Sequence, residues 1–158
     1  GGHLFPPTFL PRTEEEAMAM SKTVIKPETS EAMRYIMRLN ASHKLGTASK
    51  ANIEGYFVGG KTGTADKSFH GQYDGKRVLT TFMGIAPADK PRYLFTVILD
   101  EPQAVDGTYG FQTAGWNAGP VTGNIIERVA PFLDLPKKFD PPVSPFPPMV
   151  KLGAWGTK

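Results

Sequence analysis

Apolar side chains recur at helical spacing in two segments of the chain. The first segment spans about 30–40, where Thr29 or Ser30 is placed to cap the start of a helix. The side chains expected to face inward from it are Met33, Ile36 and Met37. A second helix is predicted to have Pro120 in its first turn and to end between 131 and 135. Its apolar stripe consists of Val121, Ile125, Ile126, Val129 and Phe132.

Three segments between these helices have the composition of β-strands: 55–65, 78–86 and 92–99. The links between them contain turn residues, at 71–75 and at 87–91. Links this short favour an antiparallel meander, because a parallel sheet would need a crossover helix in each gap. The order of helix, three antiparallel strands and helix predicts an α+β fold.

The remaining segments have weaker patterns. Residues 1–27 carry four prolines and no sustained periodicity, so we expect mostly loop with one short strand. Residues 41–52 are small and polar and are expected to form a loop. The tail 136–158 contains two Pro-Pro pairs, which favours an extended conformation.

Composition and charge exclude several classes of function. Hydrophobic residues make up 40% of the chain and charged residues 21%, as in ordinary globular domains. The net charge of +3 comes without a basic cluster, so no nucleic-acid partner is expected. There is no cysteine, and His3, His43 and His70 are too scattered to hold a metal. We therefore expect neither a metal nor a cofactor.

The segment Gly59–Thr64, with the sequence Gly-Gly-Lys-Thr-Gly-Thr, is open to two chemical interpretations. The first is nucleotide binding, because 55–62 matches the phosphate-loop pattern G-x-x-x-x-G-K-T at every position. A phosphate loop, however, follows a buried strand and opens a helix. Residues 49–54 do not look like a buried strand, and residues 63–71 do not look like the start of a helix.

The second interpretation is acyl transfer, in which a K-T-G strand borders the active site of serine enzymes that react with penicillin. A lysine supplies positive charge for a substrate carboxylate, and threonine hydroxyls donate hydrogen bonds to it. Gly63 would let a ligand approach the backbone closely, and an N–H group beyond it could point at a developing oxyanion. A bare K-T-G can also be an ordinary strand end that meets a turn.

A longer resemblance favours acyl transfer. The segment Val58–Ala65 resembles the third motif of class B penicillin-binding proteins, most closely those of cell division. The segments that follow it at family-like spacing are Thr80–Pro87, Pro91–Tyr93, Asp100–Gln103 and Ala118–Val121. The similarity covers about 1–135. It implies the C-terminal portion of a penicillin-binding transpeptidase domain with a serine β-lactamase-like fold, followed by the tail 136–158.

The resemblance implies a peptidoglycan D,D-transpeptidase whose serine is acylated by a D-alanyl-D-alanine stem peptide, or by a β-lactam in its place. Lys61, Thr62 and Thr64 would bind the carboxylate, with Gly63 between them, and the Thr64 N–H would complete the oxyanion hole. Strand alternation places Thr62 and Thr64 on one side of the strand and Lys61 on the other. The gathering of all three therefore rests on the resemblance.

The nucleophile of such an enzyme is missing from the sequence. No serine is followed by lysine three residues later, and none by asparagine two residues later. We expect both motifs upstream of Gly1, so the 158 residues alone should be inactive. An upstream segment would also anchor the protein at the periplasmic, or extracytoplasmic, face of the inner membrane.

Interaction surfaces give an alternative of a different class, in which the chain serves only as an interaction or sensing module. The tail 136–158 could dock a cell-division partner. The strand 92–99 is apolar on both faces, with Tyr93, Phe95, Val97 and Leu99 on one and Leu94 and Ile98 on the other. We expect this strand to present an unpaired edge, through which the isolated chain self-associates.

Overall fold

A computed structural model describes residues 1–135, 137 and 139. The described residues form two compact units, one comprising residues 1–33 and the other beginning at Arg34. The predicted tail 136–158 lies outside the described residues, apart from Lys137 and Phe139. In the described part of the chain, no helix combines the length and the apolar character that a membrane span requires.

The first unit contains more structure than the sequence predicted. Strand β1 (His3–Leu4) pairs antiparallel with β2 (Lys22–Thr23), and helix α1 (Glu14–Ala19) lies between them in sequence. A capping box starts α1. The Thr13 hydroxyl accepts from the Glu16 N–H at 3.2 Å, and the Glu16 carboxylate accepts from the Thr13 N–H at 2.9 Å. The prediction of loop with one short strand missed this helix, although Thr-Glu-Glu-Glu at 13–16 is a capping-box sequence.

Helix α2 (Pro27–Ser42) begins before the predicted caps Thr29 and Ser30 and runs to the end of the predicted segment and beyond. The predicted inward side is wrong for Met33 and Ile36, which are 51% and 45% exposed, whereas Met37 is half-buried. The buried residues of α2 are Arg38 and Ala41.

Arg38 explains why the other side of α2 faces the protein. Its guanidinium donates to the Val58 carbonyl oxygen at 2.6 Å and to Asn52 Oδ1 at 2.7 Å. It also lies 4.6 Å above the ring of Phe57. These contacts compensate the burial of a charged group, which a pattern of apolar residues does not register.

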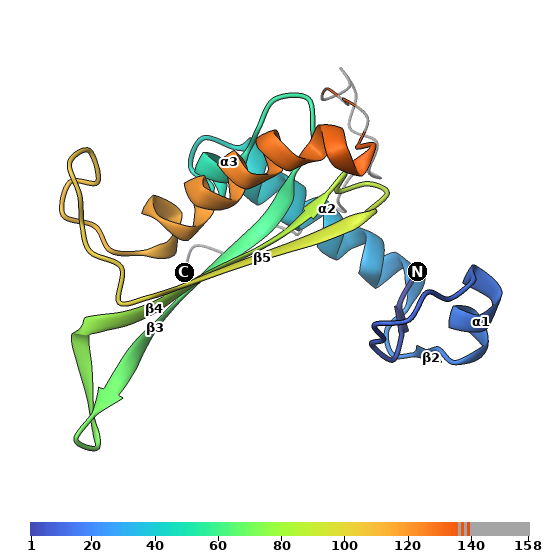
Figure 1. The fold of residues 1–158 in the computed structure, drawn as a ribbon, viewed down its shortest axis with the longest axis horizontal. Coiled ribbons are helices and arrows are strands. Elements are labelled where there is room, and N and C mark those ends of the chain that lie inside the picture. Colours follow the sequence, from blue (N-terminus) through green and yellow to red (C-terminus); the bar gives the residue numbers. More distant parts are fainter. Residues whose placement is uncertain (136, 138, 140–158) are drawn as a thin grey trace, which may run out of the picture. The chain divides into compact units, whose positions relative to one another are not determined.

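The three predicted strands form an antiparallel meander in the order β3-β4-β5, which confirms the predicted topology (Figure 1). The strands are β3 (Gly59–Phe69), β4 (Gln72–Ala86) and β5 (Tyr93–Asp100). A turn at His70–Gly71, with φ of 50° and 78°, joins the first two. Positive φ at both central residues suits a tight hairpin, so most of the predicted link 71–75 is strand instead.

The start of β3 is four residues later than predicted. Residues 56–58 are buried but lie before the strand, and Phe57 has a φ of 50°. This left-handed conformation is incompatible with an extended strand, so the chain straightens only at Gly59. The aromatic and branched residues that indicated a strand there belong to the core instead.

Helix α3 (Ala118–Val129) packs against β4, β5 and the short helix η1 (Ser49–Ala51). The predicted apolar stripe of α3 is only partly buried. Ile126 is fully buried, whereas Val121 and Ile125 are partly exposed and Phe132, just beyond the helix, is 88% exposed. The buried face of α3 consists of Ala118, Gly119, Thr122, Gly123 and Ile126. Small residues occupy most of these positions because they let the helix lie close to the sheet.

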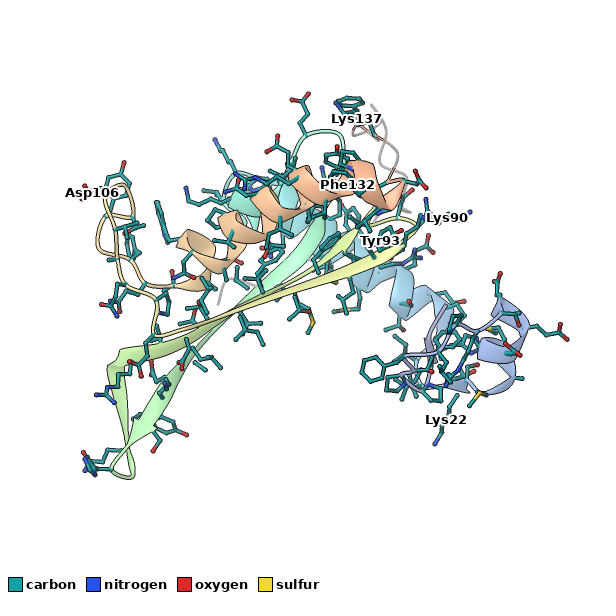
Figure 2. The ribbon with its side chains drawn as sticks, in the orientation of Figure 1. Lys22, Lys90, Tyr93, Asp106, Phe132 and Lys137 are labelled. Carbon is teal, nitrogen blue, oxygen red and sulfur yellow. The ribbon has the colours of Figure 1, made fainter. Side chains whose placement is uncertain are left out.

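Tyr93 of β5 lies near the C-terminal end of α3 (Figure 2). Its hydroxyl donates to the Leu133 carbonyl oxygen at 2.8 Å, just beyond α3. Phe82 of the central strand is fully buried beneath α3. The opposite face of the sheet exposes apolar side chains, namely Leu79, Met83, Leu94 and Ile98.

Candidate functional site

An open groove of about 610 Å³ lies beside the Lys-Thr-Gly-Thr segment of β3. Its other walls are the segment 44–50 and the short helix η2 (Ala114–Trp116). Three of the lining residues are lysines, namely Lys44, Lys50 and Lys61, and none is Asp or Glu. Five lining residues carry hydroxyl groups, namely Thr47, Ser49, Thr62, Thr64 and Thr113. A positive, hydroxyl-rich groove suits an anionic ligand.

The groove brings together three of the four predicted site residues. Thr62 and Thr64 pair with Phe82 and Thr80 of β4, whose side chains are buried on the α3 side of the sheet. Lys61 pairs with Met83 on the opposite face, as strand alternation predicts. All three nevertheless line the groove.

Gly63 is the fourth predicted site residue and is not among the groove lining. A Cβ atom at Gly63 would lie 3.8 Å from Thr81 Cβ, on the face that Lys61 shares. Its part in ligand approach stays a prediction, as does the part of the Thr64 N–H in an oxyanion hole.

Asn40 and Thr47 tie the groove walls together, and the sequence indicated neither. Thr62 Oγ1 donates to Thr47 Oγ1 at 2.9 Å. The Asn40 side chain accepts from the Thr47 N–H at 3.0 Å and donates to the Gly60 carbonyl oxygen at 2.9 Å. One amide at the end of α2 thus holds both the segment 44–50 and β3. These contacts join residues 7 and 20 positions apart, so no local pattern could indicate them.

The η2 wall is fixed by backbone contacts. The Ala114 N–H donates to Thr64 Oγ1 at 3.1 Å. A Cβ atom at Gly115 would lie 2.9 Å from the Thr47 carbonyl oxygen, so only glycine allows the two walls to approach this closely. Residues far apart in sequence therefore meet at one site.

Trp116 both packs and lines the groove. Its ring stacks on Phe111 at a centroid distance of 5.5 Å and meets the edge of Tyr109 at 5.6 Å. The Lys50 ammonium lies 4.1 Å from the centroid of the Trp116 ring. Trp116 therefore holds Lys50 in place and forms part of the groove wall as well as packing against neighbouring rings.

The phosphate-loop alternative finds no support in this geometry. Lys61 and Thr62 lie inside β3, which continues to Phe69, so no helix opens where a phosphate would bind. Nor does the described part of the chain bring three His, Asp or Glu side chains together as a metal site requires.

Comparison with known proteins identifies the family to which the chain belongs. Residues 1–127 match the model of the penicillin-binding protein transpeptidase domain. The chain is 39% identical over 124 residues to a probable peptidoglycan D,D-transpeptidase FtsI of Caulobacter vibrioides, covering 74% of the chain and 21% of that protein. It is 38% identical over 126 residues to stage V sporulation protein D of Bacillus subtilis, covering 79% of the chain and 18% of that protein. The chain thus spans about a fifth of the length of these relatives.

Solved structures agree with the sequence matches. The transpeptidase domain of penicillin-binding protein 3 from Burkholderia pseudomallei superposes with a TM-score of 0.72 at 31% identity, over 87% of this chain and 40% of that one. Penicillin-binding protein 3 from Mycobacterium tuberculosis, complexed with ampicillin, gives a TM-score of 0.69 at 26% identity, over 90% of this chain and 34% of that one. These matches confirm the fold class and the resemblance that the sequence indicated.

Proposed function

Because the chain belongs to the penicillin-binding protein transpeptidase family, we propose that it forms the carboxylate-binding wall of a peptidoglycan D,D-transpeptidase active site. The observation that carries this proposal is the groove in which Lys61, Thr62 and Thr64 meet without any lining carboxylate. The ligand is the D-alanyl-D-alanine end of a stem peptide, or a β-lactam that imitates it.

Lys61, Thr62 and Thr64 each have a part in this chemistry. The Lys61 ammonium offsets the charge of the terminal carboxylate, and the Thr64 hydroxyl donates a hydrogen bond to it. The Thr62 hydroxyl, which donates to Thr47 Oγ1 in the structure, turns from Thr47 to the carboxylate when the ligand binds. The Thr64 N–H stabilises the oxyanion that forms when a serine attacks the neighbouring carbonyl carbon. The serine–carbonyl bond forms, the bond to the terminal alanine nitrogen breaks, and that nitrogen leaves with a proton. An amine of a second peptide then displaces the serine.

The serine nucleophile is supplied by protein outside these 158 residues, since no serine here has the required lysine three positions later. The whole enzyme acts on the periplasmic side of the inner membrane, in cell-wall synthesis at division. The description of the FtsI relative as a probable peptidoglycan D,D-transpeptidase supports a role in cell-wall synthesis.

We expect the 158-residue chain to form no covalent adduct with a β-lactam, because acylation needs an activated serine. Intact-mass spectrometry after incubation with penicillin measures this directly. A longer form of the protein that includes a Ser-x-x-Lys motif should gain the mass of one penicillin under the same conditions. A stoichiometric gain by the short chain would show that one of its own serines is the nucleophile.

The isolated chain also self-associates through β5. This strand is last in the order β3-β4-β5, so one of its edges has no strand partner among the described residues. Leu94 and Ile98 are 63% and 59% exposed on one face of it. An open edge with exposed apolar side chains is a template for pairing with another chain.

The sequence of β5 favours one register for such pairing. Residues directly opposite each other in an antiparallel pair point to the same face. A two-fold axis through Thr96 would place Leu94 opposite Ile98 of the second copy, and Arg92 opposite Asp100 of the second copy. Apolar residues then meet apolar residues, and a cation meets a carboxylate.

Sedimentation at micromolar concentration is therefore expected to show a dimer. Leu94→Lys combined with Ile98→Lys places like charges opposite each other in this register and should give a monomer. Tyr73→Lys, at an exposed position of β4 remote from this edge, should leave the dimer intact. A wild-type chain that sediments as a monomer and melts cooperatively would contradict the pairing. It would also indicate that the chain has a complete core of its own.

A further inference from the structure

The groove holds more positive charge than one carboxylate requires. Lys61, Thr62 and Thr64 form the wall for the terminal carboxylate, yet Lys44 and Lys50 line the same space of about 610 Å³. No carboxylate among the lining residues offsets them. Like charges around one groove repel each other, and an anionic ligand relieves that repulsion.

Lys50 differs from an ordinary surface lysine because its backbone is anchored on both sides. It lies in the middle of η1, between Ser49 and Ala51, and both Ala48 and Ala51 are completely buried. The Ala51 N–H donates to the Ala48 carbonyl oxygen at 2.9 Å. A Cβ atom at Gly123 of α3 would lie 3.3 Å from Ala51 Cα, so the core helix packs directly against this turn.

The end of the Lys50 side chain is also positioned. Its ammonium lies 4.1 Å from the centroid of the Trp116 ring, and Trp116 is itself stacked on Phe111. A cation over one ring face can donate hydrogen bonds on its other sides. Less conformational entropy remains to be lost when an anion binds to such a pre-positioned group.

We propose that Lys50 binds a second carboxylate of the ligand, separate from the terminal carboxylate held by Lys61, Thr62 and Thr64. The inference rests on the proposed function and narrows its substrate class. The preferred ligand is a peptide that ends in D-alanyl-D-alanine and carries a further free carboxylate within reach of the groove. Trp116 is the positioning residue for Lys50, and Lys44 contributes long-range attraction from an exposed place on the rim.

Two peptides that differ in one functional group test this site. Both end in D-alanyl-D-alanine, and one has a side-chain carboxylate where the other has the carboxamide. Titration of the 158-residue chain, followed by NMR chemical shifts, gives the two dissociation constants. We expect the dicarboxylate peptide to bind about five-fold more tightly, the size of one partly exposed ion pair. The preference should shrink at high salt.

Three variants separate this site from the rest of the groove. Lys50→Gln should abolish the preference and weaken binding of the carboxamide peptide only slightly, through the loss of long-range attraction, and Lys50→Arg should restore the preference. Lys67→Gln removes the same charge from β3 outside the groove, where Lys67 pairs with Asp100 at 2.8 Å and Glu101 at 2.7 Å. It should preserve the preference.

The outcomes for the two proposals are distinguishable. A preference that survives Lys50→Gln, or a loss of affinity for both peptides in equal measure, overturns the second carboxylate site. Lys61→Gln tests the proposed function, because this variant should bind both peptides more weakly and to the same extent. Unchanged binding of both peptides to Lys61→Gln overturns the proposed function, and failure of the wild-type chain to bind either peptide overturns both proposals.

Discussion

Gly60→Ala is expected to destabilise the chain by about 3 kcal/mol, the upper range for overpacking a core. A Cβ atom at Gly60 would lie 2.4 Å from Phe82 Cζ and 2.8 Å from the Met83 carbonyl oxygen. Phe82 is completely buried in the central strand, and a Cβ atom at Gly84 would crowd it as well. Neither Phe82 nor the β4 backbone can move aside without disturbing the sheet, so β3 must shift.

Gly63→Ala is the matched control, three residues along the same strand. Its Cβ atom would meet Thr81 at 3.8 and 3.9 Å, which is ordinary van der Waals contact. Neither glycine has a positive φ, so the contrast isolates packing from backbone strain. Urea unfolding curves of the two variants measure the difference in the free energy of unfolding. If both variants were equally stable, the space around Gly60 would accept a methyl group, and the predicted clash with Phe82 would be wrong.

Lys61→Ala should reduce the rate of acylation by penicillin about 100-fold in a longer form of the protein that carries the serine, while the fold is retained. Lys61 is exposed and contributes little packing, but its ammonium offsets charge on the bound ligand and on the transition state. Stopped-flow or quench measurements of the second-order acylation rate constant determine the effect, and circular dichroism checks the fold.

Lys67→Ala supplies the control for the loss of one positive charge from β3. The hydrogen bonds from Lys67 to Asp100 and Glu101 raise the pKa of its ammonium above the ordinary value, so it is fully charged at neutral pH. It is not among the groove lining. Acylation should therefore proceed at nearly the wild-type rate. If Lys61→Ala also reacted within a few-fold of wild type, Lys61 would have no part in the site.

The sequence allowed the sheet to be predicted because its signals are local. Strand composition and short links containing Gly71 and Pro87 were enough to predict the antiparallel meander. The start of β3 was misplaced because Phe57, an aromatic residue typical of strands, adopts a left-handed conformation in the core. Local composition indicates burial there, and only the three-dimensional packing selects the backbone conformation.

The buried faces of the two long helices could not be predicted from apolar spacing. In α2 a buried arginine with backbone and ring partners determines the orientation, against the stripe that contains Met33 and Ile36. In α3 the close approach to the sheet selects small residues, such as Gly119 and Gly123. Both effects depend on the surface against which the helix packs, and that surface is distant in the sequence.

The candidate site also combines residues that the sequence indicates with residues that only the fold brings in. Lys61, Thr62 and Thr64 are contiguous in one motif, so the sequence indicated them together, and the family resemblance supplied their chemistry. Thr47, Lys50 and Trp116 reach the groove from two other segments, 44–50 and η2, through tertiary contacts. No spacing rule connects Lys50, on a short helix, with a tryptophan 66 positions later. Only the folded chain brings the Lys50 ammonium within 4.1 Å of the centroid of the Trp116 ring.

The Asn40 amide acts as a spacer of fixed length between two walls of the groove, the segment 44–50 and β3. One end of this amide holds the Thr47 N–H and the other holds the Gly60 carbonyl oxygen. The reach of a single side chain thus helps to set the width of the groove, from a helix that contributes no lining residue there. Selectivity among ligands of different bulk can consequently evolve at Asn40, without any change in a residue that touches the ligand.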